Sequence, residues 1–507
     1  MKKLALGFVA LIACGDNHDT TPLAPDSADP TPDSQTPDSP PDSNPPAFVV
    51  PTPFAVPLSV AGPDQLQSAA AGPDGTFYAA GFAAQTITSK RFVTVVRYLP
   101  TGVADPSFGA NGIVATPIEF VGGSDEVDLA VQADGKIVVS ATTASPTITG
   151  DRDLGIARLD LNGTLDATFG TLGVAIINLN DAIMTGTTPT GADASRSLTV
   201  APTGEIFLHG VSRGLGKKSA DANVDRTDTD YTVVKLLATG AVDTAFGGQS
   251  ITLGNGVTHT ADTKPGQFRL DIQETNATAR ALKVLDDGNL MVSGYASTPT
   301  TGGTVQPVVY KVTAAGTLDT TWGADAQGVF HEVVIAVQTE VYGIAIHDDG
   351  TFTTAGYGRA SGDINDFISL RFHVDPASGA NVRDLTFNNA TNGALVFDPS
   401  GAMLGSNCRN ALALPNGKTL LLGSTGPSNL PAQDAVAAFV DETGKLDTAY
   451  GDGVHVFKLG ADGNDQFWGA TVSGTKAIVV GYKGGGAANA QTETTNDDAF
   501  AAIFDIQ

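Results

Sequence analysis

The chain has 507 residues, and 28 Lys and Arg against 54 Asp and Glu give a formal net charge of −26. We do not expect so acidic a chain to bind nucleic acid, which needs a basic face, or to dock on anionic lipid by charge alone. The 59 glycines exceed average usage and indicate many turns and few long helices, and two cysteines exclude a disulfide scaffold.

The N-terminus has the pattern of a secretory signal. A short basic start precedes an apolar run over residues 4–13, which is shorter than the ~20 residues that cross a bilayer. The run ends Leu11-Ile-Ala-Cys14 and resembles the lipobox of bacterial lipoproteins. That resemblance implies a signal peptide over residues 1–13, cleavage before Cys14 and lipidation of its thiol. The alternative is an ordinary cleaved signal with an incidental cysteine.

The same resemblance implies a protein of the bacterial cell envelope that contacts the membrane through its N-terminal lipid only. In lipoprotein sorting, an Asp directly after the lipidated cysteine retains the protein at the inner membrane. Here Gly15 takes that position and Asp16 stands one place later, which favours the outer membrane. The sequence leaves open whether the protein faces the periplasm or the cell surface.

Residues 14–50 are predicted to be a disordered tether. Residues 15–50 hold nine Pro and seven Asp with no Lys or Arg, and Pro-Asp-Ser units recur along them. Such a segment cannot bury enough apolar surface to offset its ordering entropy. Proline favours polyproline II at ~3.1 Å per residue, so we expect a reach on the order of 100 Å.

One phrase, Gly-x-x-Asp-x-x-aromatic-Gly, returns after the tether, with a degenerate copy around Phe387 and Asn388. We interpret the aromatic as a wedge buried between neighbouring sheets, and the Asp as an acceptor for turn N–H groups. The alternative of repeated Ca²⁺ sites is disfavoured, because one Asp offers too few oxygen ligands. The aromatic residues of the other copies are Phe108, Phe169, Phe246, Trp322 and Tyr450.

A second phrase returns seven times and predicts a β-hairpin, because a turn glycine interrupts an alternating apolar run. A third strand follows each hairpin, and a fourth follows the aromatic-glycine turn, so each repeat predicts four strands, A to D. The turn glycines are Gly75, Gly135, Gly204, Gly288, Gly350, Gly417 and Gly474.

The repeats predict an all-β fold, a single seven-bladed β-propeller of four-stranded antiparallel blades over residues 51–507. The last copy stops at strand C, and an unpaired strand stands at the other end, over residues 55–60. We therefore predict that residues 55–60 pair with residues 500–504 and close the ring, which removes two exposed sheet edges. A β-solenoid is the alternative, although its coils have shorter and steadier periods.

The recurring Asp-x-x-aromatic-Gly phrase resembles the delta-60 repeat of bacterial surface and secreted proteins. The resemblance covers about residues 53–507, and the fifth copy departs from it with Asn388 in place of glycine. It implies a propeller-like repeat fold and implies no activity or substrate.

Motifs that could carry chemistry are few, and we predict no catalytic residue, no metal site and no cofactor. Residues 210–214 match G-x-S-x-G, but no helix is predicted to follow them. Residues 221–225 alternate oxygen ligands, yet Arg226 stands where an EF-hand loop needs glycine. We interpret Cys408 as a buried apolar residue.

The A–B and C–D turns are short and alike, whereas the B–C and D–A loops are long and varied and share one face of the propeller. Rigid scaffolds often carry function on such loops, although drift under weak constraint would also produce the variation. The candidate binding face holds basic and aromatic residues: Arg213, Lys217, Lys218, Arg226, Arg269, Arg280, Tyr295, Tyr357, Arg359 and Trp468.

The predicted function is a non-catalytic binding scaffold, a monomer that recognises a protein or a cell-envelope glycan. The alternative is a propeller enzyme, a hydrolase or lyase that acts on envelope polymers. An enzyme would need titratable groups that converge on the central channel, and no sequence motif places any there.

Overall fold

A computed structural model describes most of the chain after the predicted tether. Cys14 and the predicted signal peptide lie outside the described residues. No helix within the described part is long and apolar enough to cross a membrane. The described residues are 48–59, 62–86, 89–121, 126–253, 263–299, 303–322, 327–377, 381–390, 392–426, 433–460, 464–484 and 498–506.

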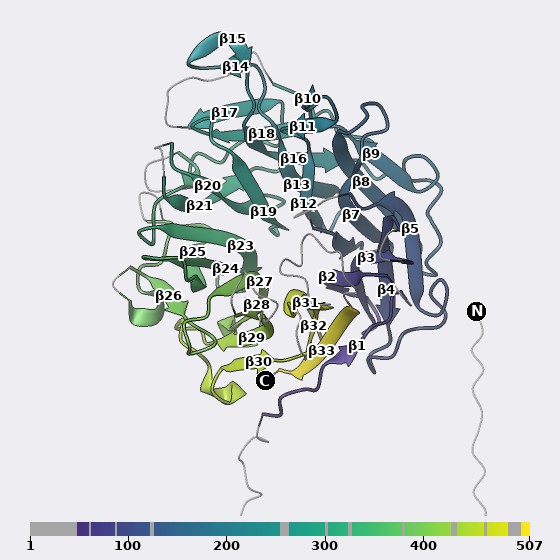
Figure 1. Cartoon of the computed structure of the whole chain (residues 1–507), viewed down its shortest axis with the longest axis vertical. Helices are drawn as coiled ribbons and strands as arrows, with labels where there is room; N and C mark the ends of the chain where they lie inside the picture. Colours follow the sequence, from purple (N-terminus) through teal and green to yellow (C-terminus); the bar gives the residue numbers. More distant parts are fainter. Residues whose placement is uncertain are drawn as a thin grey trace, which may run out of the picture. The chain divides into compact units, whose positions relative to one another are not determined.

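From Phe48 onward the chain is an all-β propeller, as predicted, with its sheets arranged around a central axis (Figure 1). Strands are long because runs of β-branched and aromatic residues alternate with turn glycines. The helical elements among the described residues are short 3₁₀ turns: η2 (Phe387–Asn389), η3 (Pro415–Gly417) and η4 (Thr448–Tyr450).

The first two repeats form separate four-stranded antiparallel blades, in which consecutive strands are hydrogen-bonded neighbours. The first blade consists of β2 (Asp64–Ala71), β3 (Phe77–Ala84), β4 (Arg91–Tyr98) and β5 (Ile113–Glu119). The second consists of β6 (Asp128–Val131), β7 (Ile137–Ala144), β8 (Arg152–Leu159) and β9 (Val174–Ile177).

The third repeat forms a five-stranded blade whose outermost pair is parallel. In order across the sheet it consists of β12 (Ala194–Val200), β13 (Ile206–Arg213), β16 (Thr229–Leu236), β18 (Gln267–Ile272) and β17 (Gln249–Leu253). Two small hairpins accompany it: β10 (Ile183–Thr185) with β11 (Thr188–Thr190), and β14 (Lys217–Lys218) with β15 (Asp221–Asp225).

The next two repeats share one eight-stranded sheet. It begins with β19 (Ala277–Val284), β20 (Leu290–Ser297), β21 (Val305–Val312) and β22 (Val329–Phe330), which pairs with β21. It continues with β23 (Gln338–Ile346), β24 (Thr351–Arg359), β25 (Asp366–His373) and β26 (Ala394–Phe397).

The remaining strands form two more four-stranded sheets, the second of which contains both ends of the propeller. One consists of β27 (Ser406–Ala413), β28 (Thr419–Thr425), β29 (Asp434–Val440) and β30 (Val454–Phe457). The other consists of β31 (Gln466–Ser473), β32 (Lys476–Lys483), β33 (Asp498–Asp505) and β1 (Phe54–Ala55).

The prediction of seven four-stranded antiparallel blades is wrong. The propeller has five separate blades, four of four strands and one of five, and an eight-stranded sheet beside them. The outer strand β22 is only two residues long and covers Val309 and Tyr310 of β21. Because the rest of that edge stays open, Val305 pairs in parallel with Gln338 at the start of β23. That pair joins two repeats into one sheet.

The predicted pairing of the N-terminal strand with the last strand is confirmed, with a shorter ladder. Phe54 pairs with Ala501 and Ala55 with Phe500, and the Val56 N–H donates to the Ala499 carbonyl at 2.8 Å. Pro57 follows, and proline has no N–H with which to extend the ladder.

A buried carboxylate reinforces this closure. Asp64, the first residue of β2, accepts the Ala499 N–H at 2.7 Å and the Ser59 N–H at 2.7 Å. It therefore connects the first blade, the last strand and the entering chain. Burial raises the pKa of Asp64 to about 6, although these backbone hydrogen bonds favour its ionised form.

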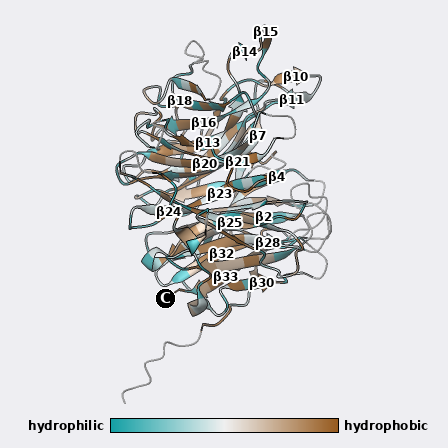
Figure 2. Ribbon diagram, turned by 90° about the vertical axis from the view of Figure 1, so that its left-hand side faces the viewer, coloured by the Kyte–Doolittle hydropathy of each residue, from teal (hydrophilic) through white to brown (hydrophobic). Residues whose placement is uncertain are grey.

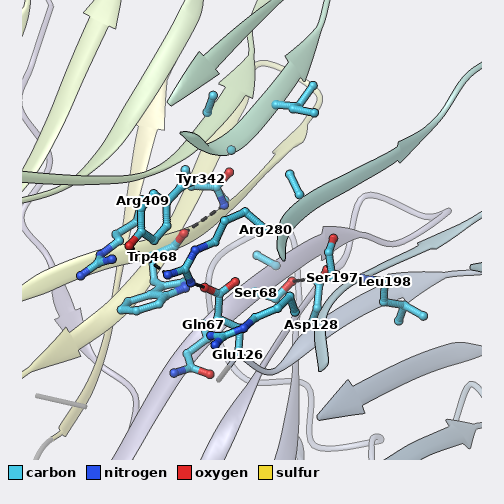
Figure 3. Close-up of a pocket in the computed structure, with 18 of the residues that line it drawn as sticks. Gln67, Ser68, Glu126, Asp128, Ser197, Leu198, Arg280, Tyr342, Arg409 and Trp468 are labelled. Carbon is cyan, nitrogen blue, oxygen red and sulfur yellow. Dashed lines mark hydrogen bonds and ion pairs between the residues drawn. The ribbon is translucent and has the colours of Figure 1, made fainter. Parts of the chain in front are cut away.

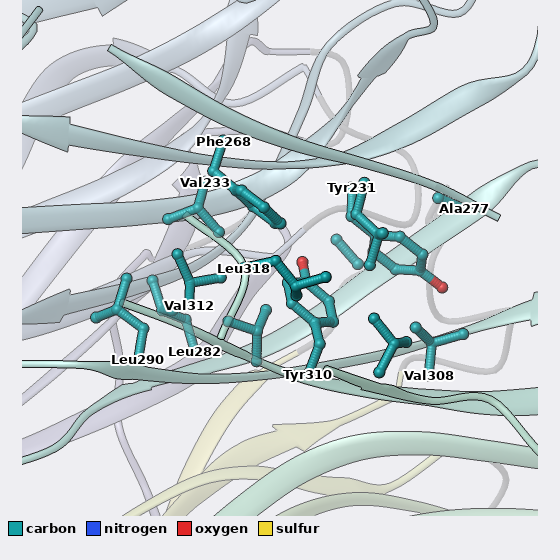
Figure 4. Packing of buried hydrophobic residues seen from close by; sticks show 14 of the residues in the cluster. Tyr231, Val233, Phe268, Ala277, Leu282, Leu290, Val308, Tyr310, Val312 and Leu318 are labelled. Atoms are coloured by element: carbon teal, nitrogen blue, oxygen red, sulfur yellow. The ribbon is translucent and has the colours of Figure 1, made fainter. Parts of the chain in front are cut away.

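Apolar strand faces make the core between sheets, as the brown segments of Figure 2 show. The predicted wedge residues Phe108, Phe169, Phe246, Trp322 and Tyr450 are all buried. In the cluster of Figure 4, Tyr310 of β21 packs against Tyr231 of β16 with ring centroids 5.8 Å apart. Burial of such rings removes on the order of 150–250 Å² each from water.

The closure gives a pH prediction. Asp64 has a folded pKa of about 6 and a usual value of 3.8, so its contribution to stability falls as pH rises from about 4 to about 6. Relative to Asp64→Asn, the parent should lose up to about 3 kcal/mol of unfolding free energy across that range. Urea unfolding at pH 4 and pH 7 measures the difference, and a constant difference would contradict the assignment.

Candidate functional site

The first strand of most repeats, called the inner strand below, has an irregular hydrogen-bond ladder, and this irregularity builds the site. In six of them the pairing register with the second strand shifts at the same place, which marks a β-bulge. A bulge leaves an extra residue outside the ladder and re-aims its side chain. The residues at the shifts are Gln67, Arg196, Arg280, Tyr342, Arg409 and Trp468, and all of them line the axial cavity.

A glycine on the second strand stands opposite each bulge. At Gly356, for example, a Cβ would overlap the carbonyl oxygen of Glu340, two residues before Tyr342. The inner strand therefore approaches more closely than any side chain would allow. The second blade has Ala141 in this position, and its ladder ends one residue short of it, at the pair of Asp128 and Ser140, without a bulge. The glycines are Gly81, Gly210, Gly294, Gly356, Gly423 and Gly481.

The bulges surround an axial cavity of about 130 Å³. Its lining comes from β2, β12, β19, β23, β27 and β31 and from residues 126–129, in and just before β6 (Figure 3). On each strand the lining begins at the bulge and continues toward the A–B turn, as with Tyr342 and Ile344 of β23. The large bulge side chains therefore stand at one end of the cavity.

The cavity is positively charged in a strongly acidic protein. Its lining holds the basic residues Arg196, Arg280, Lys283 and Arg409 and the acidic residues Glu126 and Asp128, a formal charge of +2. The whole chain carries −26. A cationic channel with low-dielectric walls concentrates anions.

Arg280 and Tyr342 form the centre of the site. Arg280 is 5% exposed and donates to Glu126 at 2.6 Å and to the Tyr342 hydroxyl at 2.9 Å. Its guanidinium also lies 3.9 Å from the centroid of the Tyr342 ring. The Tyr342 hydroxyl lies 2.9 Å from that of Tyr357 and 3.3 Å from that of Tyr295. These contacts hold both side chains in place (Figure 3).

Arg409 is the cation that these contacts leave without a counter-ion. Its guanidinium lies 4.7 Å from the Tyr342 ring centroid, 5.0 Å from Trp468 and 5.5 Å from Tyr357. Within the described part of the chain it has no hydrogen bond or ion pair, and its Nε is buried without a partner. Cation–π contacts orient the group but do not neutralise it.

The acidic groups of the lining are already used in structural bonds. One Asp128 oxygen accepts from the Ser68 hydroxyl at 2.6 Å, and the other accepts from the Leu198 N–H at 2.7 Å, so Asp128 joins three inner strands. Burial raises the pKa of Tyr342 well above its usual value, so its hydroxyl stays protonated at neutral pH. The described lining thus favours binding of an anion over general acid–base chemistry.

The structure brings together four of the ten predicted binding residues. Arg280 and Trp468 line the cavity, and Tyr295 and Tyr357 contact the residues that line it. They lie near or on the channel rather than on the outer loops.

The other six predicted residues lie elsewhere. Arg226 is 1% exposed and pairs with Asp228, with Asp230 at 2.6 Å and with Asp271 at 3.2 Å. Those three carboxylates could hold a metal ion by their spacing, but the Arg226 guanidinium already supplies their cation. The remaining residues make local contacts: Arg213 and Arg269 in the third blade, Lys217 and Lys218 on the β14–β15 hairpin, and Arg359 with Asn365.

Several cavity residues are not among the ten predicted binding residues: Gln67, Glu126, Arg196, Lys283, Tyr342 and Arg409. The usable signal is a fixed offset: the bulge residue stands eight positions before the turn glycine in Gln67 and Tyr342, as it does in Arg196, Arg280 and Arg409. The offset is six at Trp468. Glu126 has no such marker, because the second blade lacks the bulge.

Residues 132–169 match the model of a family described as "Domain of unknown function (DUF5122) beta-propeller". The matched span runs from an A–B turn to the wedge residue Phe169 and supports a propeller repeat family. No curated protein matches the sequence.

Three solved structures illustrate the structural similarities. An ulvan lyase of polysaccharide lyase family PL25 is 12% identical, with 89% of this chain and 94% of that chain covered and a TM-score of 0.43. A glucose dehydrogenase is 13% identical (74% and 96% covered, TM-score 0.40). NanB sialidase from Streptococcus pneumoniae is 11% identical (90% and 70% covered, TM-score 0.37). Identities and TM-scores this low assign neither a substrate nor an activity to this chain.

The glycine opposite a bulge can be tested where the bulge residue is fluorescent. Gly481→Ala would place a Cβ against the Gln466 carbonyl and should displace Trp468. We expect a loss of about 1–3 kcal/mol and a changed tryptophan emission spectrum. Ala141→Gly, in the blade without a bulge, is the control and should leave the emission unchanged. An unchanged spectrum in Gly481→Ala would show that the glycine is not required there.

Proposed function

We propose that this protein is a lipid-anchored binding protein of the cell envelope whose propeller takes an anionic ligand into its axial cavity. The single observation that carries the proposal is the cavity charge of +2 within a chain of −26. A long tether that holds the propeller away from a membrane, as the sequence predicts, suits capture of an envelope glycan or protein.

The surrounding structure supports binding rather than turnover. Glu126 is occupied by Arg280, and Asp128 holds three inner strands together. The ring of bulge side chains is rigid because each comes from a strand rather than a loop, and preorganised groups lose little freedom on binding.

The second candidate function is a hydrolase or lyase that acts on acidic envelope polymers. The observation that favours it is the set of tyrosines around Arg280, since a phenol beside a guanidinium can transfer a proton when its pKa is low. The raised pKa of Tyr342 opposes this role.

Binding and turnover can be separated with Lys283→Glu. Lys283 is an exposed residue of the lining, so its reversal should change the cavity charge without disturbing the core. We expect the full chain to bind acidic envelope polysaccharides in preference to neutral ones, without releasing shorter products, and Lys283→Glu to weaken binding about tenfold. Lys445→Glu, at an exposed position outside the lining, should bind as the parent does. Product release would favour the enzyme, and no preference for acidic polymers would refute the proposal.

The anchor has a separate test. Cys14→Ser should abolish lipidation and move the protein from the membrane fraction to the soluble fraction, because a thioether-linked lipid needs the thiol. Metabolic labelling with a fatty acid, followed by fractionation, measures both effects. A mutant that still fractionates with membranes as the parent does would show that the anchor lies elsewhere.

A further inference from the structure

We infer that the axial cavity is a subsite for one acidic sugar unit, a hexuronate or a pyranose of similar size with a single carboxylate or sulfate, and that Arg409 binds its charged group. This inference rests on the proposed function and gives it a ligand class.

Arg409 is the residue that an anion would neutralise. Arg409 is half-buried with its Nε enclosed. Withdrawing a cation from water without a counter-charge is costly, and the cost is recovered when an anion forms charge-assisted hydrogen bonds with it. Arg280 needs no such partner, because Glu126 lies 2.6 Å from its Nη1. Within the described lining, the planar fork of the Arg409 guanidinium bonds neither of the two carboxylates, Glu126 and Asp128. That fork matches the two oxygens of a carboxylate or sulfate.

The size of the cavity limits the ligand. Its volume of about 130 Å³ is close to the roughly 150 Å³ of an engineered cavity that binds benzene. The cavity therefore accommodates about one six-membered ring, such as the pyranose ring of a hexuronate, whereas an inorganic oxyanion is smaller than a ring and would leave space unfilled. A folded acidic protein segment would not fit, so the glycan is favoured over the protein partner.

Both the polar groups and the aromatic rings of the lining suit a sugar ligand. Asn410 donates to the Trp468 carbonyl at 2.9 Å, which leaves its own side-chain oxygen available as an acceptor. Ser68 and Gln67 also line the cavity, with the Ser68 hydroxyl donating to Asp128 and the Gln67 side chain bonding Gln65 and the Val127 N–H. Sugar sites commonly combine a few placed polar groups with aromatic walls, here Trp468 and Tyr342.

The position of Trp468 makes the test direct. Arg409 lies 5.0 Å from its indole centroid, so a ligand on Arg409 should change tryptophan emission. Titrate the full chain at low salt with glucuronate, galacturonate, glucose, a glucuronate-terminated oligosaccharide and inorganic sulfate, and confirm each result by calorimetry. We expect saturable binding of the hexuronates and at least tenfold weaker binding of glucose and of sulfate.

Two variants of Arg409 test whether its charge and its planar fork bind the acidic group of the ligand. Arg409→Gln should weaken hexuronate binding at least tenfold, and Arg409→Lys, which keeps the charge but loses the fork, should give an intermediate value. Arg359→Gln removes the same charge from a residue that bonds Asn365 outside the lining and should bind as the parent does. Circular dichroism establishes that each variant is folded.

The outcomes separate this inference from the proposed function. Hexuronate binding that a folded Arg409→Gln variant does not weaken would overturn the inference. Equal binding of hexuronate and glucose by the parent would overturn it even if Arg409→Gln fails to fold. Binding of sulfate alone would overturn the sugar assignment. If acidic polymers still bind in a way that depends on Lys283 while hexuronates do not, the proposed function stands and the inference fails. Tighter binding of free glucuronate would indicate a small metabolite as the ligand, and tighter binding of the glucuronate-terminated oligosaccharide would indicate a glycan end. Either result supports the inference.

Discussion

The close approach of the first two strands of each repeat, possible only where the second strand has glycine, is the constraint on which the site depends. Gly356 and Gly423 face backbone carbonyls so closely that no Cβ could stand between them. The resulting bulge rotates Tyr342 and Arg409 out of the pleat and into the channel. A regular ladder would have aimed those side chains at a neighbouring sheet. Backbone geometry, repeated around the axis, thus places large polar and aromatic residues at the channel.

The two acids of the cavity lining are held by other groups than Arg409. Glu126 pairs with Arg280, and Asp128 ties β2, β6 and β12 together. A carboxylate that accepts several hydrogen bonds is less available to a cation. The arginines at the bulges keep an excess of positive charge because few carboxylates remain to neutralise them.

The sequence predicted those features that repeat in register and missed those that depend on a single strand. Buried wedges such as Phe169 and the contact between the two ends at Phe54 and Ala501 follow from periodicity. The blade count failed because β22 has only two residues, and sequence patterns locate strands better than they measure them. Arg226 was predicted on a binding face, yet it is buried against the nearby Asp228 and Asp230 and against Asp271 of β18, and no local pattern encodes the contact with Asp271.

In a site built from bulges, the side chains can change while their positions stay fixed. The glycine and the strand fix where the bulge residue points, whereas its side chain makes few contacts that the fold requires. Gln67, Arg196 and Trp468 occupy equivalent positions with unrelated side chains, and each is accommodated. Where the glycine is replaced, as by Ala141, the ladder between the first two strands ends at Asp128 and Ser140, and Val127 at the equivalent position is buried. The chemistry of the channel is therefore set one residue per repeat, on a backbone that the wedge residues and the ring closure hold constant.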